Sequence, residues 1–279
     1  MFPRYIALVS ETSRISNSRL ARVAAALNKQ ATRDITPYWG VQAAVDAFAE
    51  LEDVPLGYWP IIVQDNINVP GAAGIHLDQD GQPFSLVQYS NSWSLTASHE
   101  MLEMACDPGG DRLIAGPSIK EDQGRVEYLV EVSDPSEGPE YGYTVNGILM
   151  SDFYFPRYFD PVEEAGVRYS FTGAIKKPRQ VLPGGYISWH EPISGHWWQQ
   201  TYFGAEPEFI DLGQLDLTGR SIRAAIDSVT DVPVLISGVD PENEMLQSAI
   251  RAGQNNEAAA RSKAEGWRAR IEELTSPTS

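Results

Sequence analysis

Apolar and polar residues alternate in short blocks along the first hundred positions, and the blocks predict strands and helices in turn. The apolar run at residues 5–10 predicts a buried strand, and residues 18–28 carry apolar side chains three and four apart, which predicts a helix. The same spacing predicts a second helix over residues 41–51. Two further strands are expected at residues 58–64 and 84–90. The pattern therefore mixes helices and strands from the start of the chain.

The pattern changes twice further along. A helix is expected from residue 95 to Cys106, because Pro108 disfavours helical geometry in the residue before it. Residues 126–204 are rich in strand-forming and aromatic residues, and Asn146-Gly147 is a strong hairpin signal within them. After residue 215 helical spacing returns and continues to the C-terminal end.

These elements predict an α+β fold. We expect a mixed, twisted sheet with the 95–106 helix against one face, then a β-rich second half and a C-terminal helical tail. The predicted domains are residues 1–215, a catalytic-type domain, and residues 216–279, a helical extension. The extension has one apolar seam, which predicts docking on the body or self-association.

The composition narrows the function classes. Of the 279 residues, 38 are acidic and 21 are basic, so the formal net charge is -17. A nucleic-acid-binding protein needs clustered Lys and Arg to neutralise phosphates, so no nucleic-acid partner is expected. The 42% of hydrophobic residues are enough to form a packed core.

The chain shows no sign of export or of a membrane anchor. No apolar stretch approaches the ~20 residues that cross a bilayer, and the first residues lack the pattern of a signal peptide. The single cysteine, Cys106, cannot form an intrachain disulfide. We therefore expect a cytoplasmic protein without membrane contact.

The segment from Ser98 to Pro108, SHEMLEMACDP, contains the clearest candidate chemistry. On a helix His99 and Glu103 lie on one face, one turn apart, where both could bind one metal ion. Glu100 lies ~100° around the helix, close enough to act as a general base without being a ligand. This pattern is that of the HExxH zinc proteins with Glu in place of the second His, and Glu is an accepted zinc ligand.

Two ligands from one helix do not complete a zinc site, which needs a third protein group. Glu131 and Asp134, in the string EVSDP at the end of a predicted strand, offer two carboxylates. Asp107 is a further candidate, and three histidines remain as others: His76, His190 and His196. A His and a Glu four apart also occur as a weak pair on a solvated face, but apolar residues surround this pair, so it needs buried partners.

The two motifs resemble a zincin-like, metallopeptidase-like family of bacteria and phages, and also the plant phosphate-induced proteins of EXORDIUM type. The matching residues are Ser98, His99, Glu100, Glu103, Asp107, Pro108, Glu131 and Asp134. The resemblance covers about forty residues and implies a zincin-like core with His99 and Glu103 as ligands and Glu100 as general base.

The leading hypothesis is a zinc-dependent, metallopeptidase-like hydrolase that holds one zinc ion and acts on a peptide or protein. The ligands would be His99 and Glu103 with a carboxylate from Glu131 or Asp134, and Glu100 would activate water. The alternative is a non-catalytic binding or assembly protein that retains a zincin-like core. A glycosidase is disfavoured because Glu100 and Glu103 share one helix and could not flank a sugar.

Overall fold

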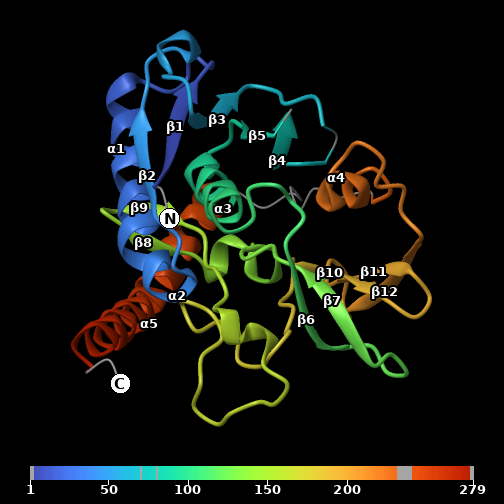
Figure 1. Cartoon of the computed structure of the whole chain (residues 1–279). Coiled ribbons are helices and arrows are strands. Elements are labelled where there is room, and N and C mark those ends of the chain that lie inside the picture. The colour runs from blue at the N-terminus through green and yellow to red at the C-terminus, as the bar shows by residue number, and fades with distance from the viewer. Residues whose placement is uncertain (1–2, 70, 80, 231–240, 277–279) are drawn as a thin grey trace.

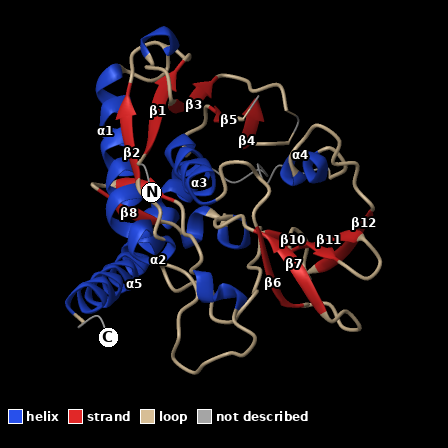
Figure 2. Ribbon diagram, viewed as in Figure 1, coloured by secondary structure: helices blue, strands red, loops and turns tan. Residues whose placement is uncertain are grey.

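The computed structural model describes residues 3–69, 71–79, 81–230 and 241–276, and it has an α+β architecture (Figures 1 and 2). Two five-stranded sheets and one small hairpin contain the strands. The first sheet has the order β2-β1-β3-β5-β4. Its strands are β1 (Arg4–Ser10), β2 (Ala43–Ala47), β3 (Tyr58–Gln64), β4 (Gly74–Gln79) and β5 (Gln82–Gln88).

The first sheet is the mixed sheet that the sequence predicts. β1, β2, β3 and β5 pair in parallel, whereas β4 runs antiparallel to β5 and forms the edge. The inner strand β1 is buried from Ile6 to Val9, as expected for a strand with neighbours on both sides and helices packed against it. The sheet therefore supplies a rigid support for the helices.

The helix predicted over residues 41–51 is wrong. These residues form the edge strand β2, in which Val45 lies opposite Ile6 of β1, followed by a bend and a short 3-10 turn. Gly40, in the left-handed conformation at φ 64°, ends the preceding helix and turns the chain. Residues 41, 43, 45 and 47 are all apolar, so the run also fits the period of a strand, and pairing with β1 decided the outcome.

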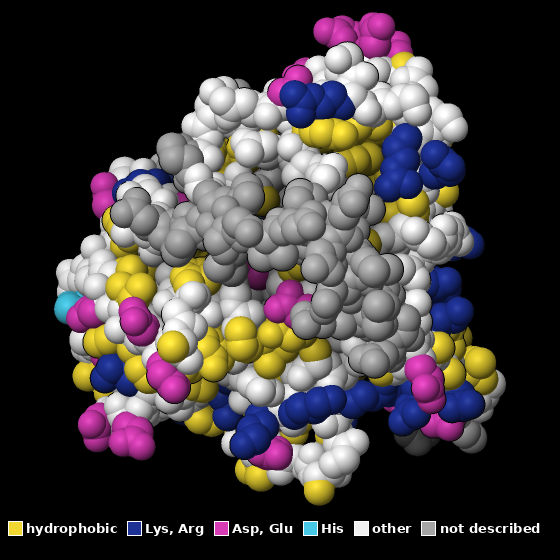
Figure 3. Space-filling model, turned by 180° about the vertical axis from the view of Figure 1, so that it is seen from behind, with side chains coloured by type: hydrophobic (Ala, Val, Ile, Leu, Met, Phe, Trp, Pro, Cys, Tyr) yellow, Lys and Arg dark blue, Asp and Glu magenta, His cyan; other side chains and the backbone are white. Residues whose placement is uncertain are grey.

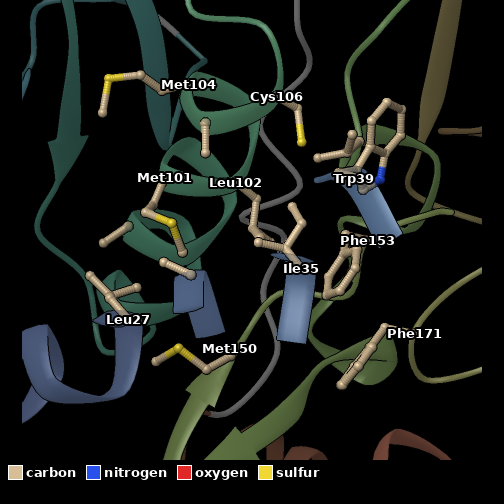
Figure 4. Close-up of a cluster of buried hydrophobic side chains, with 14 of the residues drawn as sticks. Leu27, Ile35, Trp39, Met101, Leu102, Met104, Cys106, Met150, Phe153 and Phe171 are labelled. Atoms are coloured by element: carbon tan, nitrogen blue, oxygen red, sulfur yellow. The ribbon is translucent and has the colours of Figure 1, made fainter. Parts of the chain in front are cut away.

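Two long helices pack against this sheet. Helix α1 (Asn17–Lys29) continues through a π-helical turn (Gln30–Ile35) into α2 (Thr36–Trp39), and α3 (Trp93–Cys106) lies near the middle of the molecule in Figure 1. α3 contacts β3, β4 and β5, which confirms the predicted helix against one face of the sheet. Figure 4 shows its apolar side, with Met101 and Leu102 among Leu27, Ile35 and Met150.

The second half forms an antiparallel sheet with the order β12-β11-β10-β7-β6, joined by long loops (Figure 2). Its strands are β6 (Leu113–Pro117), β7 (Arg125–Leu129), β10 (Tyr186–Glu191), β11 (His196–Thr201) and β12 (Glu208–Gly213). The hairpin β8 (Tyr143–Val145) and β9 (Ile148–Met150) turns at Asn146-Gly147, both with positive φ, as predicted.

Two helices follow the second sheet. The short helix α4 (Ile222–Asp227) lies beside the end of α3, and the long helix α5 (Pro241–Thr275) runs along the other side of the molecule (Figure 1). α5 docks on the body: Asn255 donates to the carbonyls of Glu140 and Gly142, and Ser262 donates to the carbonyl of Phe171. Docking of the tail is therefore confirmed, and self-association stays a prediction.

On the face seen in Figure 3, basic side chains lie mainly along the right and lower edges of the view, and acidic side chains mainly at the top and on the left. Within the described part of the chain, no helix is both long and apolar enough to cross a membrane.

Candidate metal centre

Helix α3 places three of the predicted site residues. It ends where Asp107 leaves helical geometry before Pro108, and the Asp107 backbone N–H still donates to the carbonyl of Glu103 at 2.7 Å. His99 and Glu103 lie one turn apart, as the spacing predicts, and both are buried.

A second segment brings the remaining carboxylates. β7 ends at Leu129, and the chain then passes through Glu131 into a 3-10 turn that starts at Asp134. Gly185 packs tightly on this turn: a Cβ at residue 185 would lie 2.5 Å from the Asp134 carbonyl oxygen. The Pro135 carbonyl also accepts a hydrogen bond from the Leu182 backbone N–H at 2.9 Å. The segment just before β10 of the second sheet therefore holds the turn in place.

The two segments bring His99, Glu103 and Asp134 together. His99 Nε2 lies 3.2 Å from Glu103 Oε1 and 3.0 Å from Asp134 Oδ1. One ligand atom of each residue lies within 4.8 Å of the others, so this group could hold a metal ion. One imidazole nitrogen and two carboxylate oxygens are a donor set that suits zinc.

The bonding of these atoms also fits a cation. Glu103 Oε1 and both Asp134 carboxylate oxygens are buried and make no well-formed hydrogen bond within the described residues. Buried carboxylate oxygens without donors are costly unless a cation neutralises them. Ligands about 2.1 Å from a tetrahedral ion lie about 3.4 Å apart, close to the distances seen from His99.

Electrostatics around His99 agree with this geometry. Burial by itself lowers the pKa of His99, but the carboxylates of Glu103 and Asp134 outweigh burial and raise that pKa well above its ordinary value. Burial raises the pKa of Asp134, since its charged form loses water. A positive charge at this point, whether a proton on His99 or a metal ion, is therefore favoured.

An unexpected residue, Arg223 of α4, joins the site. Its Nη1 atom donates to Glu103 Oε2 at 2.7 Å and to Glu131 Oε1 at 2.5 Å, and its side chain is 8% exposed. Nothing in the sequence around residue 223 marks it, and only the general need for a counter-charge near several buried carboxylates could have suggested it. The contact crosses the predicted domain boundary at residue 215.

Glu100 lies beside the group without joining it. Its side chain is buried against Gly74 of β4, where an added Cβ would lie 2.4 Å from Glu100 Oε1, so a side chain at residue 74 would displace the Glu100 carboxylate. Glu100 Oε2 is buried with no hydrogen-bond partner in the described structure. Burial raises the pKa of Glu100 to about 8.

The other carboxylate candidates have different partners. Glu131 is not in the three-residue group, and its Oε1 accepts from Arg223. Asp107 accepts backbone N–H bonds from Asp111 at 3.2 Å and Arg112 at 2.8 Å, one on each oxygen, and so shapes the loop after α3.

The remaining candidate histidines and the cysteine lie outside the group. His76 Nε2 lies 3.1 Å from the Pro108 carbonyl oxygen, whereas His190 and His196 pair with Glu127 and Asp211 in the second sheet. Cys106 is buried in the hydrophobic core (Figure 4).

Comparison with known proteins gives no match: no protein-family model, no curated protein and no solved structure is similar to this chain.

Proposed function

We propose that this protein is a zinc-dependent hydrolase of the metallopeptidase type, with His99, Glu103 and Asp134 as the metal ligands. The observation that carries the proposal is the convergence of His99 Nε2 with two buried carboxylate oxygens, Glu103 Oε1 and Asp134 Oδ1, that make no well-formed hydrogen bond within the described residues. Peptides as substrates follow from the resemblance of the HExxExxxDP and ExxD motifs to metallopeptidase-like proteins.

Each residue has a separate role in this proposal. A bound zinc ion supplies Lewis-acid activation of water and of the scissile carbonyl. Glu100 accepts the proton of the attacking water and returns it to the leaving amine. A metal ion beside it would lower its raised pKa and so favour the ionised carboxylate that this role needs. Glu131 is not a ligand in this scheme, because it lies outside the three-residue group and its Oε1 accepts from Arg223.

The burial of the site favours a second candidate, a protein in which the metal has a structural role. Asp134 is fully buried, Glu103 is 1% exposed and His99 is 9% exposed. A structural zinc site is closed by protein ligands, whereas a catalytic site keeps one position open to water and substrate.

Metal analysis of the chelator-free protein tests the proposal. We expect about one equivalent of zinc in the wild type, none in Asp134→Asn, and a full equivalent in Glu131→Gln. If Asp134→Asn binds zinc as the wild type does and Glu131→Gln does not, the ligand assignment is wrong.

Glu100→Gln separates the two candidates. With hydrolysis as the function, this variant retains zinc and loses cleavage of a quenched-fluorescence peptide library by about 10²-fold or more. If the zinc-loaded wild type cleaves no peptide in the library, the structural role is favoured and the peptidase is rejected.

A further inference from the structure

The loop after α3 contacts α4 closely at Gly110 and Asp111. Gly110 adopts φ +66°, and an added Cβ there would lie 3.0 Å from Arg223 Cβ. The Gly110 carbonyl accepts the Arg223 backbone N–H at 3.0 Å, and Asp111 Oδ1 accepts the Ile222 backbone N–H at 2.7 Å. This loop directly follows the helix that carries His99 and Glu103, so α4 is docked next to the candidate ligands.

Helix α4 places one nitrogen atom, Arg223 Nη1, within hydrogen-bond distance of carboxylates from two different segments of the site. Arg223 Nη1 carries two hydrogens, and its two short contacts join Glu103 of α3 to Glu131 of the ExxD segment, residues 131–134. Because Arg223 holds Glu103 Oε2, the other oxygen, Oε1, is left facing His99 Nε2 at 3.2 Å. The carboxylate is thus fixed with a single oxygen toward the candidate metal position.

We propose that Arg223 is a positioning residue of the metal centre. Helix α4 places Arg223 at the site, where its side chain fixes Glu103 as a ligand through one oxygen and links α3 to the ExxD segment. This inference rests on the proposed function, because it assigns Arg223 a task toward the same metal ion. Groups that hold a ligand by hydrogen bonds typically change metal affinity by about 10- to 100-fold when they are removed.

Charge and position predict opposite effects, which makes the role testable. A guanidinium near a divalent cation repels it, so charge by itself predicts that neutralising Arg223 strengthens metal binding. Positioning predicts the reverse. Lysine keeps the positive charge but is shorter and lacks the planar fork of arginine, so Arg223→Lys isolates the effect of position.

The experiment measures zinc affinity by chelator competition in full-length wild type, Arg223→Met, Arg223→Lys and Gly110→Ala. We expect all three variants to bind zinc about 10- to 100-fold more weakly. Gly110→Ala displaces α4 without touching any carboxylate, so it checks that delivery by the helix matters. Absorption of the cobalt-substituted protein should also change in Arg223→Lys, because Glu103 is free to bind through both oxygens.

Arg168→Lys is the matched control. Arg168 is also a largely buried arginine paired with a carboxylate, that of Glu265, but it lies against α5. Its replacement should leave zinc affinity and the cobalt spectrum unchanged.

The outcomes distinguish the two proposals. Zinc binding in the wild type with unchanged affinity in Arg223→Lys overturns the positioning role and leaves the metal centre intact. Tighter binding in Arg223→Met likewise overturns it, since charge then dominates. A wild-type protein that binds no zinc overturns the metal centre and the positioning role together.

Discussion

Helix α3 carries two buried polar clusters, and they are built differently. On one side Ser98 belongs to a cluster with Gln30, Asp34, Tyr143 and Ser151, which we call the rear network. On the other side lies the front cluster of His99, Glu103 and Asp134. Ser98 and His99 are consecutive, but ~100° of helix rotation points them to different sides.

The rear network satisfies its own members. Ser98 Oγ donates to Gln30 Oε1 at 2.7 Å and accepts from the Ser151 N–H at 2.9 Å. Gln30 Nε2 donates to the Tyr143 hydroxyl and the Ser151 carbonyl, and Tyr143 donates to Asp34.

The front cluster is also buried, but three of its carboxylate oxygens make no well-formed hydrogen bond within the described structure, and two of them face His99 Nε2 at 3.0 and 3.2 Å. A fully paired buried network fixes one packing arrangement, whereas a buried cluster with free acceptors indicates a ligand site. The comparison therefore indicates a structural role for Ser98 and supports the proposed metal-binding role of His99.

The largest expected effect comes from breaking the rear network. Gln30→Ala removes three hydrogen bonds and leaves a cavity, so the free energy of unfolding should fall by about 3 to 5 kcal/mol. Urea unfolding with a chelator present measures it. Asp134→Asn should lose much less under the same conditions, because it removes one of several buried negative charges. Equal losses in the two variants would contradict the comparison.

Adding zinc should act only through the front cluster. A ligand that binds the native state stabilises it by about 2.7 kcal/mol at a free concentration 100 times its Kd. Thermal unfolding at rising free zinc should show this gain in the wild type and, from a lower starting point, in Gln30→Ala. Asp134→Asn should show no gain. A zinc-dependent gain in that variant would place the ion elsewhere.

The local elements around the site could be predicted from the sequence. The end of the α3 helix followed from Pro108, and the pairing of His99 with Glu103 followed from helical geometry. The helix predicted for residues 41–51 was wrong because a short apolar run fits both the helix period and the strand period. Which structure forms depends on whether a neighbouring strand is available for pairing.

Contacts between distant segments could not be predicted in the same way. The sequence proposed Glu131 and Asp134 equally, and their spacing of three positions does not say which one faces His99. The turn at Asp134, packed against Gly185, and the arrival of Arg223 from α4 distinguish them. Both contacts join segments far apart in the chain, and local pattern carries no information about them.

The smallest predicted effect tests whether His76 belongs to the front cluster. His76 lies on β4 near the same end of α3, but it is paired: its Nε2 lies 3.1 Å from the Pro108 carbonyl oxygen, which can only accept, so the ring donates. Burial, and then the charge of Arg223, lower the pKa of His76 from 6.5 to about 4. His76 should therefore behave as a structural group.

The sign of its pH dependence follows from this shift. In the unfolded chain His76 takes up a proton below pH 6.5, whereas in the folded protein it stays neutral until about pH 4. Its contribution to stability is complete above pH 6.5 and is lost as the pH falls toward 4. Between pH 7 and pH 5.5 the loss should be about 1.2 kcal/mol.

Replacing His76 with glutamine measures that contribution. His76→Gln keeps an N–H donor for the Pro108 carbonyl and does not titrate, so its free energy of unfolding should fall by about 1.2 kcal/mol less between pH 7 and pH 5.5 than that of the wild type. Urea unfolding with chelator at both pH values gives the difference, and the carboxylates of the front cluster titrate equally in both proteins. Identical losses would mean that His76 is protonated in the folded state and belongs with the front cluster.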